Sequence, residues 1–175
     1  MRIPTGPLTL DHASQFGRPI HMASRAHRFY ESAMDDLFVD QALQGRPLDR
    51  EAVQTLTGKP RTLIECDLDE ADLSRLDLSG WTFDRCTLRR TDLSHARLVG
   101  TIWKSCRSPF ANFSGSDLSD AAFTACDVNN ASFRRATLEA ARFVRCKLTG
   151  ADLSEVKALD FHVEETLLIN AKLAG

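Results

Sequence analysis

Ala151-Asp152-Leu153-Ser154-Glu155 is one of a series of five-residue units that fill the chain from Arg61 to Gly175. In such a unit a small residue comes first, a polar residue second and a large apolar residue third. Counting in fives from Leu63 to Leu173 gives 23 third positions, and 18 of them hold Leu or Phe. First positions hold Ala, Cys, Ser, Thr or Val in 19 of the 23 units. This in-phase period predicts a repetitive fold built from one small unit.

Residues 20 positions apart also match, which indicates that four units form one coil. All five cysteines share this spacing and occupy first positions: Cys66, Cys86, Cys106, Cys126 and Cys146. Third positions at the same spacing form an apolar and mostly aromatic column: Leu63, Phe83, Trp103, Phe123 and Phe143. A five-residue period alone does not explain these columns. We therefore predict that residues 20 apart stack on one another, with both columns in the core.

These units resemble the pentapeptide-repeat family, whose consensus reads Ala, Asp or Asn, Leu and two variable residues. Matching motifs include Ala71-Asp72-Leu73, Thr91-Asp92-Leu93, Ala111-Asn112-Phe113, Ser116-Asp117-Leu118 and Ala171-Lys172-Leu173. The resemblance implies an all-β solenoid, a right-handed square parallel β-helix of about 5–6 coils at four units per coil. A single unit is too short to bury its large residue, so neighbouring coils must share one core.

The first 60 residues lack this period and fall into two parts. Residues 1–21, rich in Pro and Gly, predict an extended or disordered arm, with a secretion signal as the alternative. Residues 22–60 predict a helical cap, with one helix at about 23–44 and a second at about 49–57 between Asp49 and Gly58. We interpret the cap as cover for the open edge of the first coil, and a partner-binding helix pair is the alternative. Residues 61–175 form the predicted β-helix.

The sequence offers no constellation of residues for catalysis or metal binding. The five histidines are scattered, and no Cys lies at zinc-ligand spacing from another Cys or a His. Metal or redox chemistry at the cysteine column is a weaker alternative, because a buried thiol remote from cations is not activated. Inward Cys behaves as a small apolar residue. We therefore expect no enzyme activity and no cofactor or metal.

One unit in the middle of the repeat departs from the pattern. Ser108 occupies a third position and is followed by Pro109 and an outward Phe110. This departure predicts a loosened or bulged coil, with Phe110 as a candidate contact residue. Bulges are also expected at Trp81 and Phe161, which replace small residues.

Apolar residues at outward positions gather near the C-terminus. Leu159, Leu167 and Ile169 fall beside the last coil, and exposed apolar side chains next to an open coil favour docking. We therefore predict self-association through residues 159–175, which would give a homodimer.

Charge helps to choose between two functions that the resemblance implies. Some pentapeptide-repeat proteins protect type II topoisomerases such as DNA gyrase from quinolones and are proposed to imitate duplex DNA, which carries about one negative charge per 1.7 Å. Residues 61–175 hold 17 Asp and Glu against 15 Lys and Arg, a net charge of only −2. We favour a non-catalytic bacterial protein-interaction or scaffold module with an unidentified partner, including use as a secreted effector. Gyrase protection is the alternative.

Composition and hydropathy limit the cellular locations that the sequence predicts. No apolar run approaches the roughly 18 residues of a membrane span. The N-terminus does not resemble a Sec-type signal peptide, so a cytoplasmic location is expected by default, with secretion by a non-Sec route as the alternative. We do not expect direct nucleic-acid binding, because no net positive charge would drive it.

Overall fold

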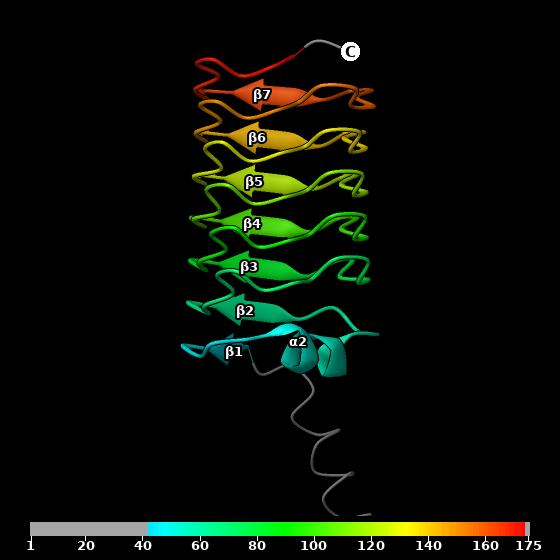
Figure 1. The fold of residues 1–175 in the computed structure, drawn as a ribbon, viewed down its shortest axis with the longest axis vertical. Helices are drawn as coiled ribbons and strands as arrows, with labels where there is room; N and C mark the ends of the chain where they lie inside the picture. Colours follow the sequence, from blue (N-terminus) through cyan, green and yellow to red (C-terminus); the bar gives the residue numbers. More distant parts are fainter. Residues whose placement is uncertain (1–41, 174–175) are drawn as a thin grey trace, which may run out of the picture. The chain divides into compact units, whose positions relative to one another are not determined.

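The computed structural model describes residues 42–173. The regular elements within this range are short strands and one helix. The strands are stacked one above the other (Figure 1). In chain order the elements are β1 (Leu43–Gln44), α2 (Arg50–Leu56), β2 (Thr62–Ile64), β3 (Thr82–Asp84), β4 (Ile102–Lys104), β5 (Ala122–Thr124), β6 (Arg142–Val144) and β7 (His162–Glu164).

Strands β1 to β7 form one parallel sheet whose order is the sequence order. Leu63 pairs with Phe83 in the first full coil step. Isolated parallel bridges repeat the same spacing on the other sides of the coil, as between Asp72 and Asp92. The predicted stacking of residues 20 apart is therefore confirmed, and the fold is a β-solenoid.

Coils and faces are numbered here from residue 61. Coil 1 comprises residues 61–80, each later coil takes the next twenty, and coil 6 is described as far as residue 173. Face 1 carries strands β2 to β7. Faces 2, 3 and 4 follow in chain order and are centred in coil 1 on Leu68, Leu73 and Leu78.

The polar second residue of each unit holds the turn that follows it. Asp72 Oδ1 accepts a hydrogen bond from the Ser74 backbone N–H at 3.0 Å, and Asp152 does the same with Ser154 at 3.0 Å. Hydrogen bonding from the Ser side chain and backbone lowers the pKa of both carboxyls. Asp and Asn suit this position because a short side-chain acceptor reaches the backbone two residues on.

The fifth residue of each unit forms the corner between two faces. Within residues 42–173 there are 18 non-glycine residues with positive φ, and all of them lie at such corners. None is β-branched, as expected for the left-handed region, where branching at Cβ is most costly. The corners therefore store backbone strain that coil stacking offsets.

The coils begin earlier in the chain than the sequence predicted. Leu43 and Gln44, expected at the end of the helix at about 23–44, form β1 and pair with β2. This corrects both the end of that helix and the predicted start of the β-helix at residue 61. Leu43 lies 20 positions before Leu63 and continues its column, so packing against the core overrides local helix propensity. The predicted arm at 1–21 and the rest of the first helix lie outside the described residues.

Helix α2 takes the place of faces 3 and 4 in this first, incomplete coil (Figure 1). The sequence placed a helix at about 49–57, and the structure has it at Arg50–Leu56. Asp49 is its N-cap and accepts a hydrogen bond from the Ala52 N–H at 2.9 Å. Val53 turns inward and is buried in the same core as the coils.

Arg50 covers part of the open edge of coil 1. Its Nη1 donates to the backbone oxygens of Asp72 at 2.9 Å and Ser74 at 3.1 Å, and to Asp72 Oδ1 at 3.1 Å. In the next coil the corresponding oxygens, those of Asp92 and Ser94, accept backbone N–H groups of the coil before. Arg50 thus replaces donors that a complete preceding coil would supply.

Each complete coil contributes a layer of four inward side chains, one from each face. Coil 1 has four leucines in its layer, at positions 63, 68, 73 and 78. Coil 3 instead combines Trp103, Ser108, Phe113 and Leu118, all fully buried. Trp103 and Phe113 meet edge to face with ring centroids 5.8 Å apart. We infer that Ser108 is small because the two aromatic rings occupy most of this layer.

The bulges predicted at the three irregular positions are not found. Ser108 donates its backbone N–H to Asp127 O at 2.7 Å, in register with the other coils. Trp81 is buried and its carbonyl accepts the Ile102 N–H at 2.9 Å. Phe161 is partly buried against the core, and β7 pairs with β6 in the regular register. The backbone register is therefore unchanged at all three positions, and at Ser108 the volumes of the neighbouring side chains compensate for the small residue.

Aromatic rings stack along two faces of the solenoid. On face 1 the ring centroids of Phe83 and Trp103 are 4.0 Å apart, and those of Phe123 and Phe143 are 4.4 Å apart. The rings in each pair are nearly parallel, with interplanar angles of 9° and 3°. These contacts add to the area buried by each ring and help to fix the register between coils.

Candidate interaction surface at the C-terminal coil

The apolar side chains near the C-terminal end of the solenoid are largely exposed. Leu159, Leu167 and Ile169, the residues that the sequence places at outward positions, are 70%, 50% and 58% exposed. Leu167 and Ile169 flank the inward Leu168 on face 2. Leu159 lies on face 4 of coil 5. The three side chains thus come from two faces at the same end of the solenoid.

Two of the three inward residues of coil 6 are exposed as well, which the sequence pattern did not reveal, while the third, Leu168, is partly buried against the core. Val163 and Leu173 occupy core positions but are 39% and 65% exposed. In coil 5 the equivalent residues, Phe143 and Leu153, are buried. In the described residues no further coil covers coil 6 or face 4 of coil 5, so exposed inward and outward apolar side chains gather at this end of the solenoid. We call this surface the C-terminal apolar end: Leu159, Val163, Leu167, Ile169 and Leu173.

The backbone at this end offers hydrogen-bonding groups in addition to apolar area. In coil 5 the N–H of Arg145 donates to Glu164 O at 2.9 Å. The N–H of Glu165, one coil later, has no backbone acceptor among the described residues. An edge strand with free N–H and C=O groups is a template for pairing with another chain. The C-terminal apolar end therefore combines an open β edge with uncovered core residues.

The repeat models of known families match most of this solenoid. The model described as the pentapeptide repeat region matches residues 61–133, and the model for pentapeptide repeats in eight copies matches residues 116–155. The chain belongs to the pentapeptide-repeat family. No curated protein matches its sequence.

Solved structures of other pentapeptide-repeat proteins resemble the chain. Trypsin-treated QnrB1, a plasmid-mediated fluoroquinolone resistance protein, is 19% identical, with 78% of this chain and 89% of that chain covered and a TM-score of 0.40. A protein of the Arabidopsis thaliana thylakoid lumen is 27% identical, with coverage of 59% and 71% and a TM-score of 0.37. HetL of Nostoc, involved in heterocyst differentiation regulation, is 22% identical, with coverage of 88% and 97% and a TM-score of 0.35.

Phe110, the other predicted contact residue of this pentapeptide-repeat protein, lies apart from the C-terminal apolar end. It stands at the corner between faces 2 and 3 in coil 3 and is 55% exposed. Three coil steps separate it from the corner of coil 6, or about 14 Å at the spacing of neighbouring strands. The structure therefore does not combine the predicted contact residues into one site.

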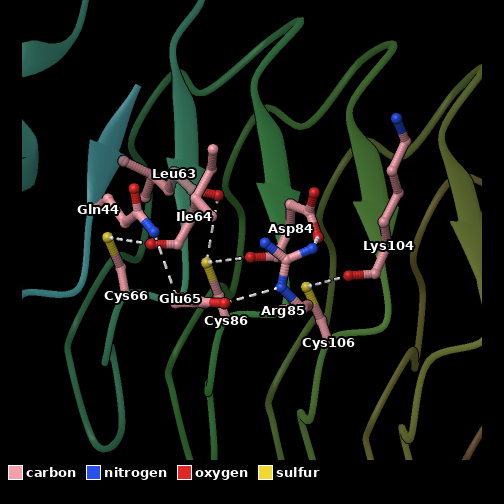
Figure 2. A network of polar contacts seen from close by, with 10 residues as sticks. All are labelled: Gln44, Leu63, Ile64, Glu65, Cys66, Asp84, Arg85, Cys86, Lys104 and Cys106. Atoms are coloured by element: carbon pink, nitrogen blue, oxygen red, sulfur yellow. Dashed lines mark hydrogen bonds and ion pairs between the residues drawn. The ribbon is translucent and has the colours of Figure 1, made fainter. Parts of the chain in front are cut away.

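The cysteine column lies inside the solenoid, next to face 1 (Figure 2). All five thiols are buried and free. Cys86 Sγ donates to Leu63 O at 3.4 Å and Cys106 Sγ to Phe83 O at 3.2 Å, so both of these thiols reach back to the preceding coil. Burial raises the pKa of the Cys66 thiol, and the neighbouring thiols of Cys126 and Cys86 raise that of Cys106. Protonated thiols of this kind serve packing and satisfy carbonyl oxygens.

The described residues contain no group of three or more His, Cys, Asp or Glu that could hold a metal ion. Within the same residues, no helix has the length and apolarity needed to cross a bilayer. A hollow of about 370 Å³ lies between the loop after α2 and coil 1, lined in part by Lys59, Pro60, Asp77 and Trp81. Sequence reasoning missed this hollow, because it forms where the helix replaces two faces of a coil.

Ion pairs between coils neutralise much of the charge on faces 1 to 3. Arg85 Nε contacts Glu65 Oε1 at 3.0 Å, and its Nη1 contacts Asp84 Oδ1 at 3.0 Å (Figure 2). Hydrogen bonding to Arg85 lowers the pKa of the Glu65 carboxyl.

Face 4 has the largest excess of acidic over basic residues of the four faces. Asp117, Asp120 and Glu139 belong to coils 3 and 4 of this face, and none of them pairs with a cation in the part of the chain that the structure describes. Within residues 61–175, face 4 holds five acidic residues (Asp77, Asp117, Asp120, Glu139 and Asp160) against two basic ones (Arg97 and Lys157), a net charge of −3.

Proposed function

We propose that the chain is a non-catalytic protein-interaction module that self-associates through the C-terminal apolar end. The observation that carries this proposal is the exposure of core-position residues Val163 and Leu173 beside the outward Leu159, Leu167 and Ile169. Apolar surface gathered at one end of a molecule favours association, because its burial removes that surface from water.

The geometry supports a symmetric arrangement in which the ends of two copies meet. A two-fold axis would bring β7 of one copy against β7 of the other, so that both open edges and both sets of apolar side chains are covered together. Because both copies use the same surface, the assembly is complete with two copies. No open β edge then remains at that end. A homodimer therefore satisfies the exposed groups without continued growth into a fibre.

Charged residues in this surface should prevent association without unfolding the coils. We expect the wild-type chain to sediment as a dimer at micromolar concentration and the double variant Leu167→Asp with Ile169→Asp to sediment as a monomer. Two carboxylates buried in an apolar interface lack partners, which costs several kcal/mol. Thr124→Asp, an outward substitution on face 1 of coil 4, is the matched control and should remain dimeric. A wild-type chain that stays monomeric at high concentration would contradict the proposal.

Protection of a type II topoisomerase such as DNA gyrase is a second candidate function, and the net charge of −3 on face 4 favours it. If this face acts like the acidic surface of DNA, the protein will relieve quinolone inhibition in a gyrase supercoiling assay. Replacing Asp117, Asp120 and Glu139 by Asn, Asn and Gln should abolish that relief. An absence of both rescue and inhibition by micromolar wild-type protein would remove this candidate and leave the interaction module unaffected.

A further inference from the structure

Phe110 differs from every other corner residue that the structure describes. The other corners hold Gly, Ala, polar or charged residues, whereas Phe110 places a large apolar side chain in the left-handed region, with φ of 61°. This conformation is unfavourable for a bulky residue. Apart from the C-terminal apolar end, the exposed large hydrophobic residues of the described chain are Phe110 and Ile102, and Phe110 is the more exposed.

The backbone holds Phe110 rigidly despite this exposure. Its N–H donates to Asn129 O at 2.9 Å, and the carbonyl of Pro109 accepts the Arg90 N–H at 3.1 Å. The residue is thus fixed to coils on both sides, and Pro109 restricts the backbone before it. An aromatic side chain on a fixed backbone can rotate only about χ1 and χ2, so it loses little conformational entropy on binding, which is a property of interface anchors.

The surroundings of Phe110 are basic on face 2. Across coils 2 to 4 this face carries Arg89, Arg90 and Arg107 against Asp127, a net charge of +2. The other carboxylates of face 2, those of Asp67, Asp69 and Glu70, belong to coil 1, two coils away from Phe110. Arg107 forms no ion pair among the described residues. Arg89 and Arg90 reach Asp69 and Glu70 only at 3.4 and 3.8 Å, and their side chains are 55% and 64% exposed.

Exposed pairs at such distances contribute little, so the guanidinium groups can turn to another acceptor. The nearest carboxylate on face 3, that of Asp92, accepts a hydrogen bond from Asn112 Nδ2 at 3.1 Å. The three arginines therefore form a positive border on one side of an apolar anchor.

We propose that Phe110 and this arginine border bind an acidic peptide segment that carries an aromatic or large aliphatic side chain. The inference rests on the proposed role of the chain as a protein-interaction module and names a second surface, separate from the C-terminal apolar end. The apolar side chain of the peptide packs on the Phe110 ring and Pro109. Its carboxylates meet Arg89, Arg90 and Arg107. An aromatic anchor beside arginines is the composition typical of binding hot spots.

The test uses the full chain and three fluorescein-labelled peptides of the same length. The first carries a Trp flanked by Asp and Glu, the second replaces the acids with Lys, and the third replaces the Trp with Ala. Fluorescence anisotropy should show binding of the first peptide. The Lys peptide should not bind, and loss of the Trp should weaken binding at least tenfold.

Protein variants then locate the site. Phe110→Ala and Arg107→Glu should each weaken binding of the acidic Trp peptide about tenfold or more, while Ser105→Ala, at the preceding corner of coil 3, should leave binding unchanged. The Tm of Phe110→Ala should stay close to that of the wild type, because Ala keeps the Cβ at the corner and the lost ring is exposed.

Failure of the acidic Trp peptide to bind the wild type, or equal binding by Phe110→Ala, would overturn the inference. The sedimentation experiment addresses a different surface, so its outcome tests the proposed function independently.

Discussion

Replacing Ser108 with Leu, the residue that most units carry at this position, will destabilise the protein rather than stabilise it. We expect a loss of about 1–3 kcal/mol in the free energy of unfolding, the usual cost of overpacking a core. Ser108 shares its layer with Trp103 and Phe113, whose rings already meet at the centre of coil 3. The added methyl and methylene groups would force these rings out of their stacked positions.

The same argument predicts rescue by a second substitution. Trp103→Leu alone should cost about 2–4 kcal/mol, because it leaves a cavity between Phe83 and Phe123. Combined with Ser108→Leu it gives a layer of three leucines and Phe113, close in composition to the four-leucine layer of coil 1, so the double variant should be more stable than the sum of the two losses predicts by about 1–3 kcal/mol. Urea unfolding of the wild type, the two single variants and the double variant measures this coupling. Additive losses would contradict the idea that the side chains of one layer share a fixed volume.

Ser108→Ala separates the volume of the side chain from its polarity. The Ser108 hydroxyl is buried and has no hydrogen-bond partner. Its removal at nearly constant volume should raise the free energy of unfolding by about 1 kcal/mol. If Ser108→Ala instead destabilises the protein, the hydroxyl has an acceptor and the role assigned to Ser108 is incomplete.

The repeat predicts the solenoid because the five-residue period of the sequence equals the period of the backbone, one unit for each face. Each Leu or Phe at a third position, such as Leu73, points inward wherever the five-residue phase is kept. Ser108 and Trp81 show where this reading fails. Each is irregular by itself, but the volume of a core layer depends on residues five, ten and fifteen positions away. The total volume of a layer cannot be read from one position of the repeat at a time. The sequence therefore predicted bulges at positions where the structure keeps the regular backbone.

The ends of the solenoid were harder to predict than its middle, for a physical reason. Leu43 lies in a segment with helical spacing, and its strand pairing is set by Leu63, twenty residues later. At the other end, the sequence indicated the outward Leu159, Leu167 and Ile169 but not the exposure of Val163 and Leu173. Those two residues have the regular pattern of buried ones, and only the structure shows that no coil within residues 42–173 covers them.

Truncation of core residues should show a large difference between the middle and the C-terminal end of the solenoid. Phe133→Ala should lower the free energy of unfolding by about 3–5 kcal/mol, since its ring is buried and stacks on Phe113 with centroids 4.8 Å apart. Val163→Ala should cost under about 1 kcal/mol in dilute solution, because the side chain is already partly in water.

Protein concentration should then separate the two variants further. If coil 6 is an interface between copies, burial in the dimer makes Val163 a core residue, and the apparent cost of Val163→Ala will rise with concentration by mass action. The cost of Phe133→Ala arises within one chain and should not change. Chemical unfolding at two concentrations a hundredfold apart measures both. A Val163→Ala cost that is independent of concentration would place the interface elsewhere, while the Phe133→Ala value would still report the layered core.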